Sequence, residues 1–144
     1  MAEVFIDTNV PMYAAGTEHP LRAPAQRIIL SLVDRQLDGA TDTETFQEIL
    51  YRYFAIGDRQ KGVELFDTFH RIMVGRILAV ADPDLLRARS LADRYPALSP
   101  RDLIHLGVML GSQIEQIITA DRGFDRVREV RRIPLESFAG NLSG

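Results

Sequence analysis

The chain opens with Val4-Phe5-Ile6-Asp7-Thr8-Asn9, a short apolar run that ends at an aspartate. An apolar run without alternation is typical of a strand that is covered on both faces of a parallel sheet. Further along the chain, residues 117–119 form a similar run shortly before Asp121. Weaker strand candidates stand at residues 39–41, at residues 77–80 and, within residues 132–138, around Ile133.

Helical patterns separate these strand candidates. Apolar residues at helical spacing or helix-starting residues predict helices over residues 22–37, 43–56, 61–73, 82–95 and 99–110. Strands that alternate with helices predict an α/β fold, here three α/β/α layers around a mostly parallel sheet of about five strands. We expect residues 1–144 to form one domain. Ligands of such sheets bind beyond the carboxyl ends of the strands, so the residues that follow each strand are the first to consider.

Composition narrows the chemistry that the chain can perform. Of its 144 residues, 46% are hydrophobic and 26% charged, as in ordinary globular proteins, and cysteine is absent. The lack of cysteine excludes a disulfide scaffold, a thiol nucleophile and thiolate metal sites. The net charge of −3 gives no sign of overall attraction to nucleic acid or membranes. Without a membrane-length apolar run or a leader-like start, we expect a cytoplasmic protein.

Four acids stand where a doubly wound sheet would bring them together. Asp7 and Asp121 follow strand candidates, whereas Glu48 and Asp102 lie near the starts of helices. Crowded carboxylates repel one another unless they are partly protonated or neutralised by cations. Ligands that are all oxygen suit Mg²⁺ or Mn²⁺, which can activate water and stabilise an in-line phosphoryl transition state. The pattern therefore predicts a metal-dependent phosphodiester nuclease.

Each acid taken singly also has a purely structural interpretation. Asp7 can cap a turn, Asp121 can serve the turn before Gly123, and Asp102 completes a capping box with Ser99. Glu48 can be a solvated helix carboxylate, although much of its helix is apolar. For single residues the structural interpretation is the more common one. The order and settings of all four favour a shared site.

These segments together resemble the motifs of PIN-domain ribonucleases of the VapC toxin type, and the resemblance runs nearly from end to end. Residues 5–9 resemble the first motif, an apolar strand followed by Asp-x-Asn. Residues 43–50 resemble the second, a helix that carries the acid before an apolar residue. Residues 101–106 resemble the third, an aspartate that opens an apolar helix, and residues 119–124 the fourth, Thr-x-Asp-x-x-Phe.

The resemblance assigns roles to particular residues. It implies that one or two Mg²⁺ or Mn²⁺ ions are bound by the catalytic acids Asp7, Glu48, Asp102 and Asp121. It further implies supporting residues that position this cluster, namely Asn9 and Thr119, with Asp125 as a further ligand or supporting acid.

Two assignments stay open at this point. Glu44 lies one helical turn before Glu48, and either side chain can point into the site; the alignment with the family favours Glu48. His105 follows Asp102 by three residues and so lies on the same side of a helix. Because its neighbours are apolar, a packed or hydrogen-bonded core histidine is the favoured interpretation.

The substrate and partners are less directly encoded. Arginines follow the last acid and can contact phosphates, but a solvated charged face is an equally good interpretation; they include Arg122, Arg126 and Arg128. The resemblance implies an RNA substrate, a homodimer and a small antitoxin protein that covers the active site. One alternative is a catalytically silent PIN-like module that binds protein or RNA. A phosphatase is less favoured, because Asn9 stands where the haloacid-dehalogenase type needs an acid.

Overall fold

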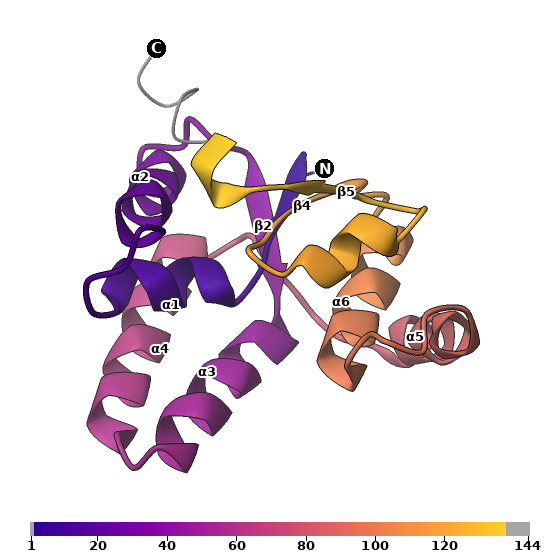
Figure 1. Ribbon diagram of the computed structural model, residues 1–144, viewed down its shortest axis with the longest axis horizontal. Coiled ribbons are helices and arrows are strands. Elements are labelled where there is room, and N and C mark those ends of the chain that lie inside the picture. Colours follow the sequence, from indigo (N-terminus) through magenta and orange to yellow (C-terminus); the bar gives the residue numbers. More distant parts are fainter. Residues whose placement is uncertain (1, 138–144) are drawn as a thin grey trace.

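The computed structural model describes residues 2–137 and contains, within them, one sheet of five parallel strands (Figure 1). The strands are β1 (Val4–Ile6), β2 (Gly39–Asp42), β3 (Ile77–Leu78), β4 (Gln116–Ile118) and β5 (Arg131–Ile133). Their order is β3-β2-β1-β4-β5, and every neighbouring pair is parallel. The predicted α/β class is confirmed, and the strand order reverses beside β1.

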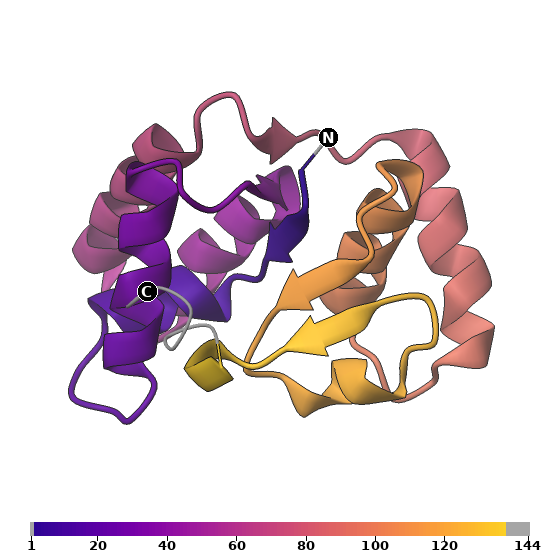
Figure 2. The ribbon, with the colours of Figure 1, turned by 90° about the horizontal axis from the view of Figure 1, so that it is seen from above.

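Helices cover both faces of this sheet (Figure 2). One face carries α1 (Asn9–Ala15), α2 (Arg22–Val33), α3 (Thr43–Ala55) and α4 (Arg59–Met73), and the other carries α5 (Asp82–Arg94) and α6 (Pro100–Gly111). The pleat of β1 supplies both cores, because Phe5 points to the α5–α6 face while Val4 and Ile6 point to the other. No helix within residues 2–137 has the length and apolar character needed to cross a membrane.

The structure differs from the sequence prediction mainly at element ends. Helix α2 stops at Val33 rather than at residue 37, because Arg35 takes a left-handed backbone conformation with φ of 57°. Helix α1 was not predicted; it has only seven residues and Pro11, which lacks a backbone N–H, lies in its first turn. Strand β5 ends at Ile133, and Phe138, the end of the predicted range, lies outside the described residues.

Capping residues place three helix starts at the carboxyl edge of the sheet. Asp42 accepts a hydrogen bond from the backbone N–H of Thr45 at the start of α3. Ser99 accepts from Asp102 at the start of α6. Asp121 likewise precedes η1, a short 3-10 helix (Arg122–Arg126). Because β2 and β4 are both parallel to β1, the starts of α3 and η1 lie at the same edge of the sheet. Helix α6 follows α5 rather than a strand, but its start lies at this edge too, since Ser99 and Asp102 line one cavity with Asp7 and Asp121.

Candidate active site

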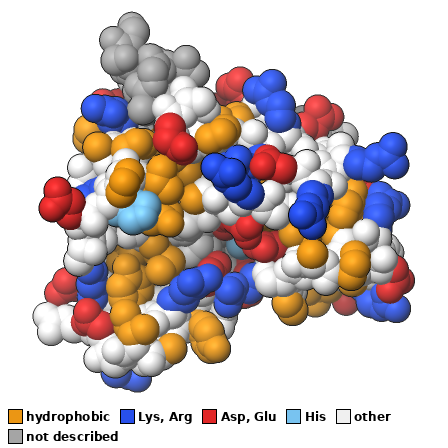
Figure 3. All heavy atoms as spheres, viewed as in Figure 1, with side chains coloured by type: hydrophobic (Ala, Val, Ile, Leu, Met, Phe, Trp, Pro, Cys, Tyr) orange, Lys and Arg blue, Asp and Glu red, His pale blue; other side chains and the backbone are white. Residues whose placement is uncertain are grey.

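A cavity of about 560 Å³ opens at the carboxyl edge of β1, β2 and β4. All four predicted acids line it, and they come from four separate segments: Asp7, Glu48, Asp102 and Asp121. The remaining lining residues are Asn9, Met12, Tyr13, Arg52, Ala97, Ser99 and Arg101. Figure 3 shows acidic side chains gathered in this hollow with basic side chains beside them. The convergence predicted from the strand ends is therefore found.

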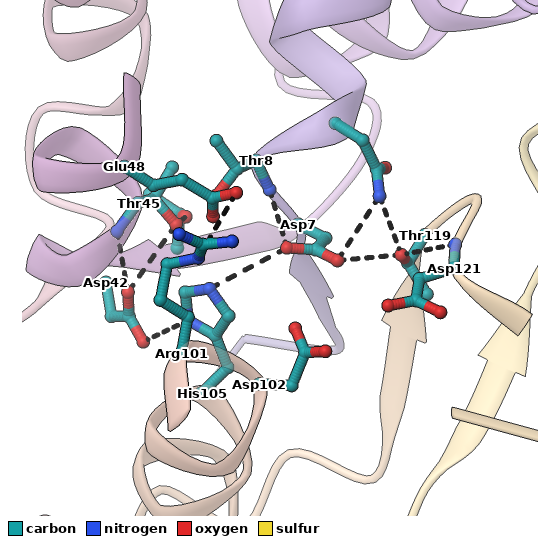
Figure 4. A network of polar contacts seen from close by, with 12 residues as sticks. Asp7, Thr8, Asp42, Thr45, Glu48, Arg101, Asp102, His105, Thr119 and Asp121 are labelled. Carbon is teal, nitrogen blue, oxygen red and sulfur yellow. Dashed lines mark hydrogen bonds and ion pairs between the residues drawn. The ribbon is translucent and has the colours of Figure 1, made fainter. Parts of the chain in front are cut away.

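Asp7 is the buried centre of the cluster (Figure 4). One carboxylate oxygen accepts a hydrogen bond from the Thr8 backbone N–H at 2.7 Å, and the other accepts from the Thr119 hydroxyl at 2.7 Å. Burial raises the pKa of Asp7, although His105 and these two hydrogen bonds act against the rise. The carboxylate is thus held rigidly in a setting that favours a nearby positive charge.

Asn9 and Thr119 tie the end of β1 to the segment after β4. The Asn9 side-chain N–H₂ donates to the Thr119 hydroxyl oxygen at 3.0 Å and lies 3.4 Å from Asp7. Its carbonyl oxygen accepts from the Ala120 N–H, while the Thr119 hydroxyl oxygen accepts from the Asp121 N–H. These contacts link Asn9 and Thr119 to Asp7, and the supporting role that the resemblance implied for both residues stays a prediction.

Asp102 shows that the carboxylates lie within each other's electric field. Figure 4 shows it between His105 and Asp121 and facing Asp7. Burial, followed by the negative charges of Asp7 and Asp121, raises its pKa to about 7. Such a perturbed acid in a cleft is typical of a functional site. A bound cation would favour the ionised form of this carboxylate.

Glu48 is also buried, but unlike Asp7 it forms ion pairs with two arginines. Glu48 Oε2 lies 3.0 Å from Arg52 Nε and 3.4 Å from Arg101 Nε. Glu44 lies one turn earlier on α3 and is half-buried, and burial raises its pKa. Sequence reasoning did not single out the two arginines. Their positions in the sequence could have indicated that they lie near the acids, since Arg52 stands four residues after Glu48 and Arg101 directly precedes Asp102.

His105 forms a buried pair with Asp42, a residue that sequence reasoning missed. Its Nδ1 lies 2.8 Å from Asp42 Oδ2, and its Nε2 lies 3.7 Å from Asp7 Oδ1. Burial alone would lower the pKa of His105, but Asp42, Asp7 and Asp102 outweigh it and raise the pKa to about 9. Asp42 ends strand β2, as Ile6 ends β1 before Asp7, so the strand-end rule could have found it.

The predicted residues of the last segment lie farther out. Asp125 is exposed on η1 and pairs with Arg132 at 2.8 Å, which lowers the pKa of its carboxyl. Arg122, Arg126 and Arg128 are exposed on and just after η1. They form a surface that a substrate can reach beside the cavity, rather than part of its lining.

The donor set fits a divalent cation. Asp7, Glu48 and His105 each offer one ligand atom, and these atoms all lie within 4.8 Å of one another. Among residues 2–137, His105 Nε2 has no hydrogen-bond partner although it is fully buried. A buried polar atom without a partner costs about 1–3 kcal/mol, and a cation bound to this nitrogen in its deprotonated form would provide that partner.

Known proteins share this sequence pattern and this fold. The family model described as PIN domain matches residues 4–130. Ribonuclease VapC13 of Mycobacterium tuberculosis is 35% identical over 130 residues, which cover 90% of this chain and 98% of that protein. Ribonuclease VapC23 of the same species is 36% identical over 118 residues, covering 82% and 92% of the two chains.

Solved structures agree on the fold. The structure of M. tuberculosis VapC20, described as a sarcin-ricin loop cleaving toxin, aligns with a TM-score of 0.72 at 16% identity over 88% of this chain and 96% of that one. VapBC2 from Rickettsia felis, solved with promoter DNA, aligns with a TM-score of 0.71 at 12% identity over 91% and 97%. The chain belongs to the PIN-domain family, as its four motifs predicted.

Proposed function

We propose that this protein is a metal-dependent endoribonuclease and acts as the toxin of a toxin–antitoxin pair. The observation that carries the proposal is the convergence of Asp7, Glu48, Asp102 and Asp121 on one cavity. Relatives that share 35% and 36% of their residues with this chain over most of its length are named ribonucleases. Since its substrate would be RNA, we assign the protein to the cytoplasm.

The four acids would hold one or two Mg²⁺ or Mn²⁺ ions. When bound, such an ion activates a water molecule and neutralises charge that develops on the phosphodiester. Thr119 and Asn9 keep Asp7 in one orientation, so that little reorganisation accompanies ion binding. A bound cation would favour the ionised form of Asp102, whose pKa is raised to about 7 by burial and by the neighbouring carboxylates.

Arg52 and Arg101 are the cations best placed for the scissile phosphate. Both line the cavity and share Glu48 as their acidic partner. A guanidinium binds a phosphate through two parallel hydrogen bonds, as it does a carboxylate. We therefore assign the phosphate nearest the reaction to this pair and the more distant RNA backbone to Arg122, Arg126 and Arg128.

A cleavage assay with Mn²⁺ or with EDTA tests the nuclease proposal. The protein should cut RNA in Mn²⁺ and should lose this activity in EDTA. Asp7→Asn should abolish cleavage while circular dichroism and melting stay those of a folded protein. Asp67→Asn, at an exposed position on α4, is the matched control and should cleave normally. Folded wild type that binds RNA without cutting it in Mn²⁺ would favour the silent-module alternative.

The proposed antitoxin would meet an apolar groove beside the cavity. The groove, of about 410 Å³, is lined from α1, α2 and α4, and Leu30 at its edge is 60% exposed. It lies on the other side of α1 from the acidic cavity, since Met12 and Tyr13 line the cavity while Pro11 and Ala14 line the groove. A partner segment that crosses α1 would therefore cover both.

Coexpression tests the partner proposal. One solved structure of this fold, from Klebsiella pneumoniae, is a toxin-antitoxin complex, and a partner of this chain should copurify with it and block cleavage. Leu30→Asp should weaken that complex without changing cleavage by the free protein, because Leu30 lies outside the acidic cavity. Unchanged copurification would place the partner on another surface.

A second copy of the chain is the other proposed partner. Leu50, Tyr51 and Phe54 leave apolar surface on α3, and Tyr51 is 58% exposed. Exposed apolar patches of this kind mark contact surfaces. Light scattering should give twice the monomer mass, and Tyr51→Glu should shift it to the monomer. A wild-type chain that stays monomeric at high concentration would contradict the homodimer.

A further inference from the structure

The buried pair of Asp42 and His105 connects two of the helices that carry the predicted acids. Asp42 is fully buried, and each of its two carboxylate oxygens has a different partner. Its Oδ1 accepts from the Thr45 N–H at 3.1 Å and so caps α3, while its Oδ2 lies 2.8 Å from His105 Nδ1 on α6. One carboxylate thus joins the helix that carries Glu48 to the helix that carries Asp102.

This pairing fixes which way the imidazole faces. Because Nδ1 binds Asp42, Nε2 is turned toward Asp7, at 3.7 Å from its Oδ1 (Figure 4). That separation is too long for a hydrogen bond. Within the described part of the chain Nε2 has no other partner, and the ring is fully buried.

The separation is one that two ligands of the same metal ion would have. Ligand atoms about 2.1 Å from one ion lie roughly 3.0 to 4.2 Å apart, depending on whether they are adjacent or opposite. Nε2 and Asp7 Oδ1 fall inside this window. Glu48 lies close to both residues, since Asp7, Glu48 and His105 each offer one ligand atom within 4.8 Å of the others. An ion that binds Nε2 takes the place of a ring proton.

We propose that His105 is a metal ligand of this site, through Nε2, and that Asp42 is the residue that positions it. Carboxylates that hold a ligating histidine in this way fix the ring orientation and increase its basicity. The proposal rests on the metal-dependent function proposed above and sharpens it. An imidazole nitrogen beside Asp7 and Glu48 favours Mn²⁺ over Mg²⁺, which binds nitrogen poorly.

Electron spin-echo envelope modulation on the Mn²⁺-loaded wild type tests the proposal without any substitution. Protein labelled with ¹⁵N only in its histidines should show a directly coordinated nitrogen whose frequencies differ from those of the unlabelled protein. Mn²⁺ that binds without nitrogen coupling would overturn this inference and leave the metal-dependent nuclease standing. A wild type that binds no Mn²⁺ would overturn both.

Binding measurements on variants give a second readout. His105→Gln should abolish the nitrogen coupling and raise the Kd for Mn²⁺ by about 100-fold or more, at least as much as the roughly 10- to 100-fold that follows the loss of a residue supporting a ligand. The Kd for Mg²⁺ should change much less. His70→Gln, at an exposed position on α4, is the matched control and should keep both the coupling and the Kd.

Asp42→Asn separates positioning from folding. Asparagine is also a good N-cap, so the start of α3 is preserved while the charged partner of His105 is removed. The Kd for Mn²⁺ should rise about tenfold with the protein still folded. Equal losses of Mn²⁺ and Mg²⁺ affinity in His105→Gln, or unchanged Mn²⁺ affinity in both variants, would contradict the assignment.

Discussion

Asp7 separates two sides of the site that are built from different interactions. The hydroxyl side, formed by Asn9 and Thr119, holds Asp7 through side-chain hydrogen bonds from neutral groups. The imidazole side, formed by Asp42, Glu48 and His105, is made of buried charges and of a nitrogen, His105 Nε2, that has no hydrogen-bond partner within residues 2–137. Neutral hydrogen bonds position a ligand at little cost, whereas buried charged groups shift one another's pKa values and so respond to pH and to a bound cation.

The two sides should respond differently to their surroundings. The hydroxyl side should determine geometry and be insensitive to pH near neutrality, because its donors do not titrate there. The imidazole side should determine how pH and metal ions change stability. We therefore expect the largest effects on cleavage and stability from a substitution that acts on both sides. A substitution on one side should have a smaller effect, and substitutions on the outer surface the smallest.

The largest expected effect comes from Asp102, which faces both sides. Asp102→Asn should lower cleavage by roughly a hundredfold to a thousandfold, equivalent to about 3–4 kcal/mol of transition-state stabilisation. In EDTA at pH 8 the same change should stabilise the protein by about 1–3 kcal/mol, because it removes a poorly solvated charge. Activity assays and thermal melts measure the two effects.

Asp93→Asn serves as its control, since Asp93 is exposed on α5 and pairs with Arg89. It should change neither cleavage nor melting. A lower melting temperature for Asp102→Asn in EDTA would show that the carboxylates are not crowded in the way the structure describes.

The pH dependence of stability should have opposite signs with and without metal. The folded-state pKa values of Asp102, about 7, and His105, about 9, both exceed their ordinary values of 3.8 and 6.5. The folded protein therefore holds these protons more tightly than the unfolded chain, and the stability that they contribute is present at low pH. It is lost between about pH 4 and 7 for Asp102 and between about pH 6.5 and 9 for His105.

Melting curves from pH 5 to 9 check this expectation. In EDTA the free energy of unfolding should fall by about 2 kcal/mol or more across this range. In excess Mn²⁺ it should rise instead, because the cation binds the deprotonated ligands. Identical pH profiles under both conditions would mean that the metal does not contact the imidazole side.

A smaller effect is expected on the hydroxyl side. Thr119→Val keeps the shape of the side chain but removes the hydroxyl that contacts Asp7, Asn9 and the Asp121 N–H. The loss should cost about 1–3 kcal/mol of stability and lower cleavage about tenfold. The pH profile of melting should keep its shape, in contrast to a change on the imidazole side.

Thr17→Val, at an exposed position between α1 and α2, is the matched control and should leave cleavage unchanged. If Thr119→Val instead shifted the pH profile strongly, the division of the site into a neutral and a charged side would be wrong.

The smallest effect should come from the outer arginines. Reversing Arg126 and Arg128 to Glu should weaken RNA binding a few-fold at low salt and flatten its salt dependence, by about one unit of slope for each phosphate that is no longer neutralised. Both side chains are exposed. Filter binding over a range of salt concentrations measures the slope, and an unchanged slope would place the RNA backbone elsewhere.

Local patterns were sufficient to predict most helices, the strands and the four acids that converge. Apolar runs and capping residues such as Ser99 act over a few residues, so they can be recognised without knowing the fold. The metal-binding roles of Asp7, Glu48, Asp102 and Asp121 remain predictions. Helix α1 was missed because it is short and no side chain caps its start.

Long-range pairings were beyond the reach of such patterns. Asp42 and His105 are 63 residues apart, and each has an ordinary local explanation, as a helix cap and as a core side chain. Arg52 and Arg101 likewise look like solvated helix residues until the fold brings both to Glu48. Only contact in space shows that these residues belong to the site.

The sequence by itself therefore determined the fold class, the family and the set of acids, because hydrophobic periodicity and motif order are written along the chain. Only the tertiary structure decided which arginines and which histidine lie beside those acids and offset their negative charge. The strand order β3-β2-β1-β4-β5 puts the end of β2 beside the end of β1, so that Asp42 can turn His105 toward Asp7. Electrostatic energies depend on distance and burial, and neither is encoded in the spacing of residues along a chain.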